Sequence, residues 1–186
     1  MSNRPSATVR IEDYALIGDC RSAALVSRAG SIDWLCWPRF DSAAIFAALL
    51  GGPEHGRWSI TPEDPCPRVR RRYREGTLIL ETDWETADGA VTLIDFMPLE
   101  GERPDLVRLV VGRRGQVAMR TELVLRLDYG VTVPWITRLE DGRGLRAVAG
   151  PDMVVLRAET QMRGEDLTTV GDFTVQAGET VSFVLS

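Results

Sequence analysis

The most regular hydrophobic pattern of the chain runs from Val117 to Asp128. Every second position carries a side chain suited to a core, namely Val117, Met119, Thr121, Leu123, Leu125 and Leu127. The alternate positions carry mostly polar or small side chains, namely Ala118, Arg120, Glu122, Val124, Arg126 and Asp128. A period of two predicts a β-strand with one buried and one wetter face, as is typical of antiparallel sheets.

Short β-prone runs separated by turn residues fill most of the chain after Tyr14. Residues 23–27 and 31–37 flank Arg28-Ala29-Gly30, which predicts a hairpin in which Gly30 adopts a positive φ. Two further hairpins are predicted, 78–85 with 91–97 around Ala87-Asp88-Gly89, and 106–111 with 117–128 around Arg113-Arg114-Gly115-Gln116. Candidate strands at the C-terminal end are 135–139, 145–149, 153–160, 167–175 and 180–185.

One segment favours a helix. Asp41 or Ser42 can cap the run AAIFAALL, and Gly51-Gly52 followed by Pro53 provides a stop. The pattern therefore predicts an all-β fold, an antiparallel two-sheet β-sandwich with one short helix over 41–50. Residues 1–13 are expected to form a flexible N-terminal tail, and residues 14–186 the sandwich domain.

The composition of the chain disfavours several classes of partner, ligand and location. A net charge of −5 disfavours nucleic-acid binding. No apolar run is long enough to span a membrane, and the N-terminus lacks the apolar stretch of a secretory signal. Cys20, Cys36 and Cys66 are widely spaced, which fits reduced thiols in the cytoplasm. With His55 as the only histidine, neither a metal site nor a cofactor is predicted.

Catalytic groups are hard to identify from the pattern. Paired carboxylates perform glycoside hydrolysis, and candidates exist at Asp83, Glu85, Asp95, Glu122 and Asp128, but the sequence does not show which two would face each other. His55 lies in a Gly/Pro-rich loop, where a solvated role is favoured over catalysis. The arginines of residues 68–74 favour a solvated or salt-bridged strand over a contact with an acidic partner.

Residues 31–41, SIDWLCWPRFD, have the composition of a carbohydrate-facing loop. Aromatic faces stack on sugar rings, and Asp or Arg side chains bond to sugar hydroxyls. A structural interpretation is equally physical: Trp34 and Trp37 would belong to the core, and Arg39 and Asp41 would form an ion pair that fixes the turn. Composition does not decide between the two.

Several segments together resemble a known family. They are Gly18-Asp19-Cys20, residues 23–50, residues 56–62, Arg71-Arg72-Tyr73, residues 78–84 and residues 95–98. These resemble the N-terminal domain of family 15 glycoside hydrolases, the glucoamylases and their trehalase-like relatives. The resemblance implies a β-sandwich that precedes a linker and an (α/α)6 barrel, which carries the two catalytic glutamates of an inverting hydrolysis.

This resemblance sets the functional expectation. The chain ends where the sandwich should end, so no catalytic residue can be assigned in it. We expect a non-catalytic domain that packs on and supports a downstream barrel, with Trp37, Arg39, Phe40 and Asp41 as candidates for contact with that barrel or with an α-glucoside substrate. The isolated domain is expected to self-associate through the face that the barrel covers.

Two alternatives remain open. The chain could be a stand-alone carbohydrate-binding module that uses Trp34, Trp37 or Trp58 as a stacking platform. An independent enzyme with its own carboxylate pair is the least favoured interpretation.

Overall fold

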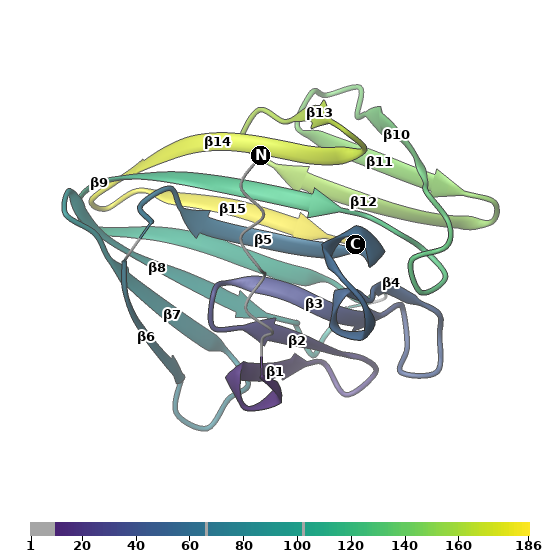
Figure 1. Cartoon of the computed structure of the whole chain (residues 1–186), viewed down its shortest axis with the longest axis horizontal. Coiled ribbons are helices and arrows are strands. Elements are labelled where there is room, and N and C mark those ends of the chain that lie inside the picture. The colour runs from purple at the N-terminus through teal and green to yellow at the C-terminus, as the bar shows by residue number, and fades with distance from the viewer. Residues whose placement is uncertain (1–9, 66, 102) are drawn as a thin grey trace.

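The computed structural model describes residues 10–65, 67–101 and 103–186, and over these the protein is all-β (Figure 1). One antiparallel sheet, sheet A, contains β1 (Tyr14–Gly18), β2 (Ala23–Ser27), β3 (Ser31–Cys36), β4 (Ala44–Phe46), β5 (Arg57–Pro62), β9 (Leu106–Val124), β13 (Arg163–Glu165) and β14 (Thr168–Gln176). Its strands lie in the order β1-β2-β3-β5-β9-β14-β13, and β4 pairs with β3. The other sheet, sheet B, contains β6 (Arg68–Tyr73), β7 (Leu80–Glu85), β8 (Gly89–Phe96), β10 (Trp135–Arg138), β11 (Gly144–Ala149), β12 (Asp152–Ala158) and β15 (Thr180–Leu185), together with the same β9. Its strands lie in the order β6-β7-β8-β9-β15-β12-β11-β10.

The helices of the described residues are single 3-10 turns: η1 (Ile11–Asp13), η2 (Ala48–Leu50) and η3 (Pro53–His55). Most of the expected N-terminal tail, residues 1–9, lies outside the described residues, and η1 occupies the end of it. None of the helices described is long and apolar enough to cross a membrane.

β9 belongs to both sheets, and the turn expected at residues 113–116 is wrong. Residues 106–111 pair with β15 in sheet B, and residues 116–123 pair with β14 in sheet A. A bulge between Ala90 and Val91 of β8 marks the crossing. At the crossing a Cβ on Gly112 would lie 1.9 Å from the carbonyl oxygen of Gln176. The strand continues because partners on both sides satisfy its backbone, which a local turn signal cannot reveal.

The short helix expected over 41–50 is also wrong. Residues 44–46 form β4, which pairs with β3 through Leu35–Phe46 and Cys36–Ala44. All three β4 residues are buried. Tertiary pairing in a buried site therefore overrides the helical propensity of the alanines, and only the 3-10 turn η2 remains before Gly51.

The core confirms the alternation from which the fold was predicted. All six apolar or Thr positions of the predicted face are buried, at Val117, Met119, Thr121, Leu123, Leu125 and Leu127. The two sheets contact each other through Trp58 of β5 and Phe183 of β15, whose ring centroids lie 6.3 Å apart. The predicted hairpin at Gly30 is present with a φ of 80°.

A buried arginine joins the two sheets. Arg108 of β9 is fully buried, and its Nε and Nη2 donate to the two carboxylate oxygens of Asp95 in β8, at 2.8 and 3.3 Å. Nη1 also donates to the carbonyl of Trp58 in β5 of sheet A, and Nη2 to the carbonyl of Gly30 in the turn between β2 and β3, each at 2.7 Å. The guanidinium carbon lies 5.0 Å from the Trp58 ring centroid, a cation–π contact. Burial raises the pKa of Asp95, and the charge of Arg108 opposes this effect.

We expect Arg108→Met to lower the free energy of unfolding by about 3–5 kcal/mol, because it leaves Asp95 buried without a counter-charge. Urea titration followed by circular dichroism measures this. Asp95→Leu combined with Arg108→Met should recover part of the loss, since neither charge then remains buried. Equal destabilisation by the single and double variants would contradict the interpretation that Arg108 compensates the buried charge of Asp95.

Candidate functional site

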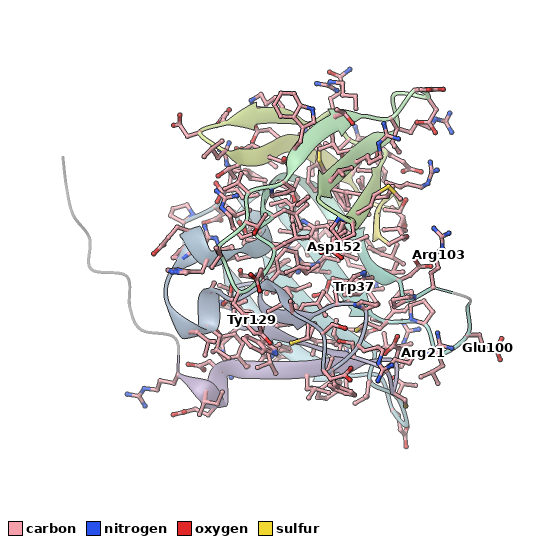
Figure 2. All side chains as sticks on the ribbon, turned by 90° about the vertical axis from the view of Figure 1, so that its right-hand side faces the viewer. Arg21, Trp37, Glu100, Arg103, Tyr129 and Asp152 are labelled. Carbon is pink, nitrogen blue, oxygen red and sulfur yellow. The ribbon has the colours of Figure 1, made fainter. Side chains whose placement is uncertain are left out.

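A hollow lined by Trp37, the Trp37 hollow, lies at one end of the two packed sheets and has a volume of about 880 Å³. Five segments far apart in the sequence line it, and they contribute among others Trp37, Arg103, Asp128, Asp152, Met153 and Ser186. Figure 2 looks at this end and shows Trp37 between Asp152 and Arg21, with Arg103 beside it. An aromatic ring with two carboxylates, a guanidinium and small hydroxyls is a lining suited to a polar organic ligand such as a sugar.

The segment Gly18-Asp19-Cys20 holds one wall of this hollow in place. The buried Asp19 carboxylate accepts the backbone N–H of Arg21 at 2.9 Å and of Ser22 at 2.8 Å. The Ser22 hydroxyl donates to the carbonyl of Cys36, the residue before Trp37. The backbone N–H of Phe40 donates to the carbonyl of Arg21 at 2.9 Å. The turn at residues 19–22 therefore positions the loop that contains Trp37 and Phe40.

The structure separates the four candidate contact residues. Trp37 is half-buried, packs against the core and lines the hollow. The other three are exposed on the loop and do not line it. Arg39 pairs with Asp41 through Nε and Oδ1 at 3.0 Å, with both side chains about 70% exposed, and Phe40 is 61% exposed. The ion pair considered for the loop is thus present, and any contact of these residues with a ligand or another domain stays a prediction.

Sequence reasoning missed Arg103 and Asp152 as neighbours of Trp37. Asp152 lies between the predicted strands 145–149 and 153–160, and neither it nor Arg103 carries a local signal of a site. Asp128, noted only as one acid among several, lines the hollow with a φ of 53°. These residues come together because loops from both sheets meet at one end, and strand order alone determines that meeting.

Most of the other candidate carboxylates form ion pairs. Asp83 pairs with Arg72 and accepts the Thr92 hydroxyl at 2.7 Å. Glu122 pairs with Arg57 at 3.1 Å and Arg120 at 3.0 Å. Asp95 is held by Arg108. These carboxylates therefore balance the charges of nearby arginines.

The salt-bridged interpretation of the arginine strand is confirmed. Arg72 of β6 and Arg74, the residue that follows β6, both pair with Glu81 of β7, at 2.5 and 2.7 Å. A hydrogen bond from Arg74 is the main cause that lowers the pKa of Glu81.

Three further candidates have structural roles. Trp58 is fully buried, and its Nε1 donates to Thr121 Oγ1 at 3.0 Å, so it is not a stacking platform. Burial raises the pKa of the Cys36 thiol, which disfavours a nucleophilic thiolate. His55 Nδ1 accepts the backbone N–H of Gly52 at 3.2 Å. Cys66 lies outside the described residues, and within the residues described no three His, Cys, Asp or Glu side chains gather as metal ligands.

Comparison with known proteins finds a family that matches most of the chain. Residues 4–179 match the family described as trehalase-like, N-terminal. The chain belongs to this family. It is 41% identical over 87 residues to a trehalase of Mycolicibacterium smegmatis, a match that covers 47% of this chain and 13% of that protein. It is 34% identical over 130 residues to trehalase 2 of Sulfolobus acidocaldarius, which covers 70% of this chain and 21% of that protein.

The matches cover only a small fraction of the length of each relative. A trehalase of Mycobacterium tuberculosis is matched over 98 residues at 38% identity, 53% of this chain and 14% of that protein. The matches span 13–22% of the length of the curated relatives. The trehalase-like N-terminal domain is therefore a small part of these larger proteins.

We expect Asp19→Ala to lower the free energy of unfolding by about 1.5–3 kcal/mol, because two backbone N–H groups lose a charged acceptor. Asp19→Asn keeps one acceptor oxygen and should recover part of the loss. Asp41→Ala is the matched control, since its carboxylate is exposed and should matter little. Thermal unfolding measures all three variants, and equal effects of Asp19→Ala and Asp41→Ala would contradict the positioning role.

Proposed function

We propose that the chain is the non-catalytic N-terminal β-sandwich domain of a trehalase-like glycoside hydrolase of family 15, which packs on and supports a downstream catalytic (α/α)6 barrel. The observation that carries the proposal is the match to a trehalase-like N-terminal family over residues 4–179, together with the 13–22% of each relative that the chain spans. The relatives are named trehalase, which favours an α-glucoside as the substrate of the complete protein.

The ion pairs formed by the acidic side chains favour a non-catalytic role for this domain. An inverting hydrolase needs two carboxyl groups about 6.5–9.5 Å apart across a substrate site. In this domain Asp83, Asp95 and Glu122 each have an arginine partner. Their charges stabilise the sheets, and we assign the acid and base of the reaction to the barrel.

The Trp37 hollow gives this proposal a second part. Trp37, Arg103, Asp128 and Asp152 provide a ring face and polar groups of both charges at one open end. We place this end, with the exposed Arg39, Phe40 and Asp41 on its outer wall, against the barrel near the substrate entrance. The free thiols of Cys20 and Cys36 suit a cytoplasmic protein.

In a second candidate function, a stand-alone carbohydrate-binding module, the same hollow would be the sugar-binding site. In that case Trp37 would stack on a sugar ring without help from another domain. Trp37 also packs against the core, so only part of its side chain faces the hollow.

We expect the 186-residue chain to release no glucose from trehalose or maltooligosaccharides, because Asp83, Asp95 and Glu122 are each paired with an arginine and the acid and base are assigned to the barrel. The polypeptide encoded by the complete reading frame should release glucose from one of them. A coupled glucose assay measures both. Turnover by the purified chain that is lost when Asp128 or Asp152 is changed to the amide would overturn the proposal. Trehalose binding by the chain alone in calorimetry would favour the carbohydrate-binding module.

For the loop, we expect Arg39→Ala in the complete enzyme to lower kcat/KM by about ten- to a hundredfold, the effect of losing a charge-assisted bond of about 1.5–3 kcal/mol. Arg10→Ala is the matched control, because Arg10 also pairs with an acid two residues on and is 77% exposed. The melting temperature of the chain should change little in both variants. A lower melting temperature with unchanged kinetics would show that Arg39 acts only within the loop.

A further inference from the structure

A row of three apolar side chains crosses the outer face of sheet B. Trp135 of β10 lies opposite Val148 of β11, and Val148 lies opposite Met153 of β12. Their exposed fractions are 77%, 38% and 50%. The residues next to them along the strands, Ala147 and Val154, are buried and face the core. The row therefore points away from the interior by the alternation of the strands.

A groove lies between β10 and the β13–β14 hairpin, next to the Trp135 end of this row. It has a volume of about 410 Å³, and its lining includes Val133, Trp135 and Leu167 together with Arg126, Arg138 and Arg163. Val133 and Leu167 are 50% and 70% exposed. Leu167 lies at the tip of the β13–β14 hairpin with a φ of 60°, a conformation that is costly for a bulky side chain.

The opposite edge of sheet B is covered. The Tyr73 hydroxyl of β6 bonds to both the N–H and the carbonyl of Leu16 in β1, each at 2.9 Å. Arg71 donates to the carbonyl of Val26 at 3.0 Å. A charged strand closed against the other sheet is a common protection of a sheet edge. At β10, by contrast, no strand among the described residues lies beyond the edge.

We propose that this apolar surface, the β10 surface (Val133, Trp135, Val148, Met153 and Leu167), is the docking site for the downstream catalytic part of the same polypeptide. This inference rests on the proposed function and assigns to it a particular face of the domain. Large exposed apolar patches mark interaction sites, and interdomain faces typically bury about 600–1,500 Å².

The position of the last residue favours this occupant over a second copy of the chain. The N–H and carbonyl of Ser186 both bond to Val155 of β12, at 2.8 Å each. Val155 is two residues from Met153 on the same strand and points to the same face. β10 lies three strand spacings from β15, about 14 Å. Any polypeptide that continues past Ser186 starts beside the β10 surface.

The chemistry of the surface defines what its partner must offer. The five side chains are aliphatic, aromatic or thioether groups, and none of them carries a charge. The part of the catalytic domain in contact with them must therefore be apolar, such as the outward stripe of one or two helices.

Hydroxyl-radical footprinting tests the docking site directly, because Trp and Met are readily oxidised where they are exposed. The samples are the 186-residue chain at low micromolar concentration and the polypeptide encoded by the complete reading frame. We expect oxidation of Trp135 and Met153 to be about fivefold slower in the complete polypeptide, as for side chains covered by an interdomain interface. Tyr73, 42% exposed at the opposite edge, is the internal control and should not change.

The other outcomes overturn the inference in distinguishable ways. Equal oxidation of Trp135 and Met153 in both samples would overturn the docking site and leave the proposed function intact. Protection that appears in the complete polypeptide only as its concentration rises would show that a second copy, and not the same polypeptide, covers the surface. A reading frame that encodes no further domain would overturn the proposed function and this inference together.

Substitution gives a second, independent readout. Trp135→Ser with Met153→Ser should speed proteolytic cleavage between the sandwich and the rest of the complete polypeptide about tenfold, the effect of losing about 1.4 kcal/mol of docking. The melting temperature of the chain alone should barely change, because both side chains are at least half exposed. Ile11→Ser with Leu78→Ser is the matched control, since these are 68% and 48% exposed away from β10. Equal cleavage rates in the two double variants would overturn the docking site.

Discussion

The buried guanidinium of Arg108 fixes how the two sheets face each other. It donates two hydrogen bonds to Asp95 within sheet B and two to backbone carbonyls, at Trp58 of sheet A and at Gly30 in the turn between β2 and β3. Removing two charges from water is costly, and geometry this complete is what offsets the cost. The planar fork of arginine reaches four acceptors, which the single ammonium of lysine could not match. A shift of either sheet by one residue would break these bonds and leave a buried charge unpaired.

This constraint extends to the end of the molecule. Gly30 begins the hairpin whose second strand, β3, runs directly to Trp37. A Cβ at Gly30 would lie 2.6 Å from the carbonyl oxygen of Ile60, so no other residue fits there without displacing β5. The Asp19 turn then holds the far end of β3 through Ser22 and Cys36. Gly30 and Asp19, which belong to the segments that resemble the family, therefore help to position the Trp37 hollow.

The two edges of sheet B differ in a way that suits one domain of a larger protein. The β6 edge is closed by Tyr73 and by arginines paired with Glu81. The β10 edge carries an exposed Trp135 beside a groove that includes Leu167. A free sheet edge with large apolar side chains is a liability for an isolated protein. The same features become an advantage when another part of the polypeptide covers them.

The sequence by itself determined the local elements. The alternation at residues 117–128 and the turn residues at Gly30 predicted a strand face and a hairpin that depend only on neighbouring residues. It also pointed to Trp37, because aromatic and polar residues gather there in the chain. The strand β4, the passage of β9 through the apparent turn at residues 113–116, and the meeting of Trp37 with Arg103 and Asp152 were decided only by the tertiary structure. In each of these cases the deciding hydrogen bond, burial or neighbour comes from a segment distant in sequence, and local propensity carries no information about such partners.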